Sequence, residues 1–161
     1  MQKFDVIVIG TGSGSGVAKR CAKEGKKVAI IDYHPFGGTC PLRGCMPKKT
    51  LEGVARLLAL NEQLLGKGIT KVAKASWKDL IKFKNTITEP KSQDTIDSLK
   101  KAGITIFHGK AKIIDENSIQ VNDHILHGEK FVFANGSAPT KLSIPGEDLL
   151  IDSTEFMDME K

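Results

Sequence analysis

The chain opens with apolar runs and polar breaks that predict a strand, a helix and a second strand. Residues 4–9 form a β-branched apolar run that ends in the glycine-rich segment 10–16. A helix-compatible stretch follows at 17–24, Gly25 ends it, and residues 27–32 form a second apolar run. Because a helical crossover joins parallel strands with a right-handed connection, this region is expected to fold as a βαβ unit.

The middle of the chain changes to a helical period. Apolar residues recur at helical spacing from Leu51 to Leu65, and a second helix is expected from Ser76, a suitable N-cap, with Pro90 bending or interrupting it. We expect both helices to face a core. Short strands separated by Gly, Asp and Asn are then predicted at residues 104–107, 111–114, 118–121, 124–127 and 130–134.

These elements predict an α/β fold: a Rossmann-like, dinucleotide-binding parallel sheet with helices, and a small β-meander around residues 104–127 packed on it. A length of 161 residues is typical of one domain. No apolar run reaches the length of a membrane span, and the first strand begins too early for a signal peptide, so we expect a cytoplasmic protein with no membrane partner.

The net charge of +5 comes from lysines spread along the chain, and aromatic residues make up only 6% of it. A nucleic-acid-binding surface usually gathers basic and aromatic residues on one face, so we do not expect a nucleic-acid partner.

The glycine-rich segment is typical of a dinucleotide-binding turn. Gly10 allows the tight turn and Gly12 allows a pyrophosphate to approach the backbone, while the third glycine position falls on Ser15. Asp32 follows at the end of the second strand, where a carboxylate accepts hydrogen bonds from a ribose hydroxyl. The turn alone does not distinguish FAD from NAD, although Asp32 argues against the 2′-phosphate of NADP in this site.

Two cysteines lie close together in the loop that follows. Cys40 and Cys45 are separated by four residues, and a disulfide between them would close a small, easily reduced loop at the start of the next helix. That helix terminus, together with Lys48 and Lys49, favours a reactive thiolate. A metal site would need further ligands, and the four histidines show no zinc-type spacing, so no metal is predicted.

The segment 37–49 resembles the redox-active signature of the class I flavoprotein disulfide reductases, which include glutathione reductase, dihydrolipoamide dehydrogenase and mercuric reductase. The turn 10–16 and the segment 134–139 are similar to the family's flavin-contacting segments. The resemblance implies FAD as cofactor, with Cys45 facing the flavin, Cys40 as the interchange thiol and Lys49 near the flavin; these three are the implied catalytic residues. The implied cofactor-binding residues are Gly10, Gly12, Ser13, Gly14, Asp32, Gly38, Thr39, Cys40, Lys49, Ala111, Ala134, Gly136 and Ser137.

The same resemblance implies that residues 1–150 are the N-terminal part of an FAD-binding domain and that 151–161 lead toward a nicotinamide-binding domain. The complete polypeptide would use NAD(P)H as electron donor, reduce a small-molecule disulfide or similar acceptor, and form a homodimer. Two alternatives stay open at this point: a non-catalytic or partner-dependent flavin-binding module, and a thiol-based metal or redox sensor.

Overall fold

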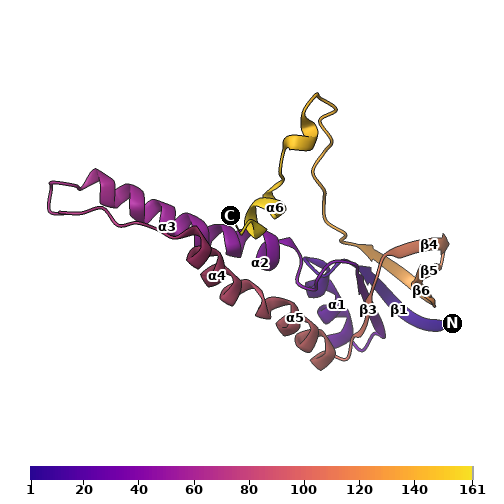
Figure 1. Cartoon of the computed structure of the whole chain (residues 1–161). Helices are drawn as coiled ribbons and strands as arrows, with labels where there is room; N and C mark the ends of the chain where they lie inside the picture. Colours follow the sequence, from indigo (N-terminus) through magenta and orange to yellow (C-terminus); the bar gives the residue numbers. More distant parts are fainter. Residues whose placement is uncertain (161) are drawn as a thin grey trace. The chain divides into compact units, whose positions relative to one another are not determined.

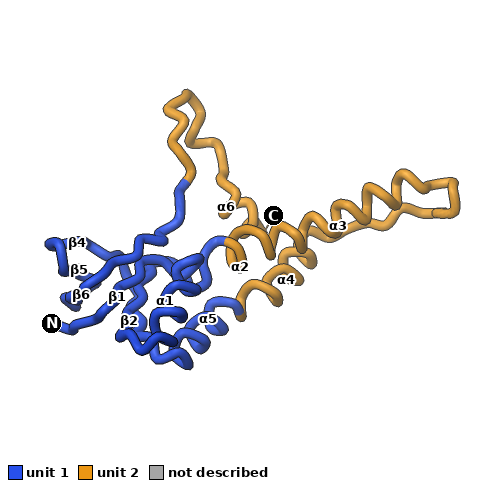
Figure 2. The backbone as a smooth tube through the Cα atoms, turned by 180° about the vertical axis from the view of Figure 1, so that it is seen from behind, with its two compact units in different colours: residues 1–39, 91–138 blue, residues 40–90, 139–161 orange. Residues whose placement is uncertain are grey.

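The computed structural model describes residues 1–160, and its elements follow one another as Figure 1 shows. Contacts divide the chain into two compact units (Figure 2). Unit 1 contains Met1–Thr39 and Lys91–Ala138, and unit 2 contains Cys40–Pro90 and the chain from Pro139 onward. The predicted domain boundary after residue 150 stays a prediction.

Unit 1 is built on one six-stranded sheet with the strand order β3-β2-β1-β6-β5-β4. Strands β1, β2, β3 and β6 run parallel to one another, while β4 and β5 continue the sheet as an antiparallel meander with β6. The α/β fold with a parallel core and a meander is therefore confirmed. The strands are β1 (Gln2–Ile9), β2 (Val28–Asp32), β3 (Thr105–His108), β4 (Ala111–Asp115), β5 (Ser118–Val121) and β6 (His124–Phe133).

Side chains alternate across the two faces of this sheet because successive strand residues point in opposite directions. On one face, Val6 and Val8 pack with residues of two helices, α1 (Gly14–Lys23) and α5 (Pro90–Lys101). On the other face, Ile7 packs with apolar residues of the meander. Both faces are thus covered, as the apolar runs of the two predicted strands require.

Two details of the predicted strands were wrong. Strand β3 does not belong to the meander, because it pairs in parallel with β2 at the far edge of the sheet. The segments 124–127 and 130–134 form one continuous strand, β6, with Gly128 inside it. A Cβ at Gly128 would lie 2.8 Å from a side-chain carbon of Ile7, so this glycine serves close packing and does not make a turn.

Unit 2 is helical. It contains α3 (Cys45–Gln63), α4 (Trp77–Thr88), a 3₁₀ turn η1 (Glu147–Leu149) and α6 (Ser153–Asp158), and it includes all of α2 (Thr39–Arg43) beyond its first residue. The Ser76 hydroxyl caps α4 by accepting a hydrogen bond from the amide of Asp79 at 3.3 Å, which confirms the predicted N-cap. Pro90 is the first residue of α5, a position that suits proline because no intrahelical hydrogen bond needs its missing N–H. The proline therefore separates α4 from α5.

The expected burial of the helical stretch at residues 51–65 is only partly right. Leu51 of α3 is buried with Ile81 and Met157, but Leu57 is 60% exposed and Leu64 is 47% exposed. Helical spacing identifies an apolar face and does not show whether a partner covers that face. Among residues 1–160, no helix is both long enough and apolar enough to span a membrane.

Candidate functional site

Gly10, the first glycine of the turn between β1 and α1, cannot be replaced without a cost in stability. Gly10 has φ +103°, in the left-handed region, and a Cβ there would overlap the carbonyl oxygen of Ala134. The Gly10 amide donates to the carbonyl of Ile31 at 2.7 Å, and the Ala134 amide donates to Ile9 at 2.8 Å. The first glycine therefore allows the ends of three parallel strands to come together.

Gly14 brings the helix close to the sheet. A Cβ at Gly14 would lie 2.8 Å from a methyl carbon of Val8 and 3.2 Å from the Cβ of Ala134. This is the close helix–strand packing expected of the third glycine position, which the fingerprint spacing puts at Ser15. Ser15 instead donates a hydrogen bond from its hydroxyl to the carbonyl of Thr11.

Gly12 lies between these two and is exposed. Its backbone faces Gly38, which has φ +76° and whose Cβ, if present, would overlap the Cα of Gly12. The Ser13 side chain makes no capping hydrogen bond to α1, so no side chain of the N-cap residue occupies the backbone amides at the start of this helix. A glycine-lined turn at a helix N-terminus is suited to binding phosphate groups.

The Asp32 side chain, only 9% exposed, holds this turn to the end of β2. Its Oδ2 accepts two hydrogen bonds from Thr11, one from the amide at 2.7 Å and one from the hydroxyl at 2.6 Å. Its Oδ1 accepts a hydrogen bond from the amide of His34 at 3.0 Å. An ionised carboxyl can accept about four hydrogen bonds, so Oδ1 retains capacity for a further donor.

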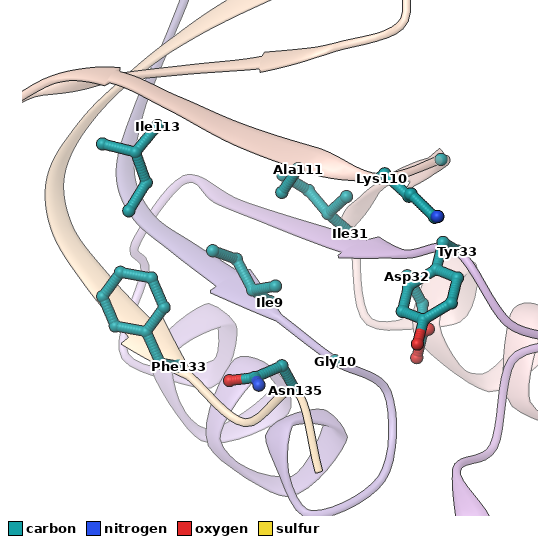
Figure 3. A pocket seen from close by; sticks show the side chains of 11 residues that line it. Ile9, Gly10, Ile31, Asp32, Tyr33, Lys110, Ala111, Ile113, Phe133 and Asn135 are labelled. Carbon is teal, nitrogen blue, oxygen red and sulfur yellow. The ribbon is translucent and has the colours of Figure 1, made fainter. Parts of the chain in front are cut away.

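A pocket of about 440 Å³ lies beside this network (Figure 3). Asp32, Tyr33 and Lys110 form one part of its lining, and the Lys110 Nζ lies 5.5 Å from the centre of the Tyr33 ring, within cation–π range. The amide of Gly109 donates to the carbonyl of Asp32 at 2.8 Å and so keeps the start of β4 beside β2. The other lining residues are Ile9, Gly10, Ile31, Gly109, Ala111, Ile113, Phe133 and Asn135.

Unit 2 brings the two thiols together. Cys40 lies in α2, a short helix in a segment predicted to be a loop, and Cys45 begins α3. Gly44 between them has φ −138° and ψ −108°, which separates the two helices. Both thiols are free and exposed to solvent. Small molecules in solution can therefore reach both sulfur atoms.

The pKa of the Cys40 thiol is raised above its ordinary value. The main cause is a side-chain hydrogen bond with Cys45, and partial desolvation and the charge of Cys45 act in the same direction. Lys49 lowers this pKa, in the direction expected from the sequence, but its effect is outweighed. Lys48 points elsewhere, since its Nζ lies 4.0 Å from a carboxylate oxygen of Glu52.

The predicted site residues thus fall into two sets. Gly10, Asp32 and Ala111 line the pocket in unit 1, while Cys40, Cys45 and Lys49 form the thiol group in unit 2. Ser13, Gly136 and Ser137 are exposed and lie outside the pocket lining. Sequence reasoning missed Thr11, Tyr33 and Lys110; the only signal for Thr11 was a hydroxyl between two glycines of a turn followed by an acidic strand end.

Comparison with known proteins decides the family. A sequence profile described as pyridine nucleotide-disulphide oxidoreductase matches residues 4–161. The chain belongs to this family. A glutathione reductase from Nostoc sp. is 35% identical over 160 residues, which cover 98% of this chain and 35% of that protein. A mercuric reductase from Bacillus cereus is 30% identical over 164 residues, covering 98% of this chain and 26% of that one.

Solved structures of this oxidoreductase family share the fold. The Cu(II) complex of RclA, an HOCl-induced flavoprotein disulfide reductase from Escherichia coli, superposes with a TM-score of 0.84 at 26% identity and covers all of this chain and 35% of that one. The chain therefore spans about a third of the length of the relatives it matches. It corresponds to an FAD-binding portion of a flavoprotein disulfide reductase family.

Proposed function

We propose that this chain holds FAD and is the part of an NAD(P)H-dependent disulfide oxidoreductase in which electrons pass from the flavin to Cys40 and Cys45. The observation that carries the proposal is the pair of exposed thiols on two consecutive helices, Cys40 in α2 and Cys45 at the start of α3, with Cys45 close enough to raise the pKa of Cys40. Two neighbouring thiols that can form one disulfide are the chemical requirement for exchanging an electron pair with a disulfide substrate.

The residues of unit 1 fit the dinucleotide end of FAD. The turn at Gly10, Gly12 and Gly14 presents backbone without side chains. Asp32 lines a pocket, and its Oδ1 can still accept a hydrogen bond from a hydroxyl group. In this proposal the pyrophosphate contacts the turn, the ribose donates to Asp32, and Ala111 contributes a backbone contact. The other proposed contacts of the cofactor are Ser13, Gly38, Thr39, Ala134, Gly136 and Ser137.

The chemistry of the thiols is a sequence of two exchanges. The Cys40 thiolate attacks an acceptor disulfide, forms a mixed disulfide and releases one acceptor thiolate; the Cys45 thiolate then attacks Cys40 Sγ, forms the internal disulfide and releases the second. The pair loses two electrons and the acceptor gains them. When bound, FAD supplies the two-electron chemistry that links a nicotinamide to this disulfide. The charge of Lys49 opposes the rise in the Cys40 pKa, although Cys45 outweighs it, and it favours the thiolate form that makes the first attack.

The acceptor is proposed to be a small molecule that reacts with thiols. The relatives include glutathione and mercuric reductases, and RclA is a disulfide reductase solved as a Cu(II) complex. These descriptions name glutathione, mercuric ion, and a disulfide reductase with Cu(II), and the exposed Cys40 and Cys45 suit either a disulfide or a thiol-binding metal ion. The nicotinamide donor and homodimer formation are proposed for the longer polypeptide.

A flavin-binding module without catalysis is the second candidate, because the chain spans about a third of the relatives' length. An anaerobic titration of the FAD-loaded chain with a dithiol distinguishes the two. We expect the dithiol to bleach the flavin in the wild-type protein and to do so far more slowly in the Cys45→Ser variant, with Cys21→Ser as the matched control. Bleaching that is equally slow in all three proteins would favour the module.

A thiol-based metal sensor is the third candidate. It requires metal at Cys40 and Cys45, and the described residues contain no group of three or more His, Cys, Asp or Glu side chains that could hold an ion. Elemental analysis of the purified chain tests this candidate: stoichiometric metal without flavin would replace the proposal above.

A further inference from the structure

Thr11 occupies an unusual position in the turn, because its hydroxyl joins three segments of unit 1. The hydroxyl donates to Asp32 Oδ2 at 2.6 Å and accepts a hydrogen bond from the amide of Gly37 at 3.0 Å. Its amide donates to the same carboxylate oxygen at 2.7 Å, and its carbonyl accepts from the Ser15 hydroxyl. A single side chain thus connects the turn, the end of β2 and the segment that leads to Gly38.

These bonds form in a nearly dry environment. Thr11 is 1% exposed and Asp32 is 9% exposed. A hydrogen bond to a charged group is stronger than one between neutral groups, and a buried group left without its partner costs more than the bond itself contributes. Only a hydroxyl can both donate to Asp32 and accept from Gly37, so among residues of this shape serine preserves the connection and valine removes it.

The same bonds fix the carboxylate of Asp32, which is one of the residues that line the pocket. Thr11 supplies two donors to Oδ2, while Oδ1 receives one donor, from His34. Oδ1 is therefore the oxygen with spare acceptor capacity, and the bonds to Oδ2 restrict rotation of the carboxyl group. The bond to Gly37 also holds the neighbouring Gly38 backbone against Gly12.

We propose that Thr11 is a positioning residue that orients Asp32 for the ribose hydroxyls of an adenine nucleotide and holds the Gly37–Gly38 segment against the turn. The proposal rests on the proposed function, because it takes the pocket at Asp32 as the adenosine end of the FAD site. Thr11 acts through Asp32 and does not itself contact the ribose.

The test compares two nucleotides on three proteins by titration calorimetry of the full chain. ADP and 2′-deoxy-ADP differ only in the ribose 2′-hydroxyl, which is proposed to donate a hydrogen bond to Asp32. We expect the wild-type chain to prefer ADP by about tenfold or more, as a bond to a carboxylate implies. Thr11→Val should reduce this preference to within about threefold, which corresponds to the loss of most of that bond. Thr11→Ser should restore the preference.

A purely structural role predicts a different pattern. If Thr11→Val weakens both nucleotides by the same factor and keeps the preference for ADP, the positioning role is overturned and the proposed function stands. The same conclusion follows if the wild-type chain binds both nucleotides equally. If the wild-type chain binds neither nucleotide nor FAD, the proposed function fails and this inference fails with it.

A second measurement does not depend on nucleotide. Hydrogen exchange at the Gly37 amide in the free chain should become at least tenfold faster in Thr11→Val and stay near the wild-type rate in Thr11→Ser, because only valine removes the acceptor. Thr11→Ala replaces Thr11→Val if the valine variant does not fold. Unchanged protection of Gly37 in the folded variant would overturn the proposal.

Discussion

Replacing Gly12 with alanine separates the structural role of the glycine turn from its proposed role in binding. The nearest atom to a Cβ at this position is the Cα of Gly38 at 3.7 Å, which is an ordinary van der Waals distance, and Gly12 is not in the left-handed region. The fold should therefore accept the methyl group. Because alanine restricts the unfolded chain more than glycine does, the variant should gain about 0.4–1 kcal/mol of stability.

The same methyl group would occupy the surface along which the pyrophosphate is proposed to lie. Crowding a close contact by one methyl group typically costs about 1–3 kcal/mol, so the affinity for ADP should fall by roughly 5-fold to 150-fold. The assays are thermal unfolding without ligand and calorimetric titration with ADP. Gly16→Ala is the matched control, since a Cβ there meets no described atom within 4 Å; it should bind ADP as the wild type does.

A Gly12→Ala variant that unfolds at or above the wild-type temperature and still binds ADP within about threefold of the wild type would refute this reasoning. A variant with greatly reduced stability would also refute it, because the measured distance of 3.7 Å predicts no clash.

Three other perturbations test separate parts of the structure. Gly10→Ala puts a side chain at φ +103° against a main-chain oxygen and should lower the free energy of unfolding in urea by about 2–4 kcal/mol; a loss below about 0.5 kcal/mol would contradict the observed geometry. Cys45→Ala removes the hydrogen bond that raises the pKa of Cys40, so the midpoint for alkylation of Cys40 against pH, followed by mass spectrometry, should move down; an unchanged or higher midpoint opposes this. Lys84→Met removes the donor that lies 2.8 Å from the carbonyl oxygen of Met157 and should lower the free energy of unfolding by about 1–3 kcal/mol. Asp158→Asn changes the exposed carboxylate paired with the same amine and should lower it by under about 1 kcal/mol. Equal costs would be inconsistent with the burial of Lys84.

The sequence predicted well those features that local pattern determines. The apolar run before Gly10, the helix after it and the second strand ending at Asp32 are all present, because strand runs, glycine turns and helix ends are encoded within a few residues. Ser76 was recognised as an N-cap for the same reason. The meander was placed on the parallel sheet, where its side chains do pack with Ile7.

Features that depend on distant contacts were not predictable in this way. Gly128 looked like a strand break, but its role is set by Ile7, which lies on another strand. The pairing of β3 with β2 depends on which edge of the sheet is free, and the exposure of Leu57 depends on whether a partner covers α3. Thr11 was overlooked because its importance comes from Asp32, far along the chain, and not from the glycine spacing.

The most direct test of the central claim is the visible absorption spectrum of the 161-residue chain after mixing with FAD, removal of unbound cofactor and addition of a dithiol. The account predicts that the chain retains flavin and that the first reduction, of Cys40 and Cys45, adds a long-wavelength band, as a thiolate beside oxidised flavin would produce, before further dithiol bleaches the flavin. A chain that elutes without flavin, while folded, would contradict the claim that these residues form an FAD site.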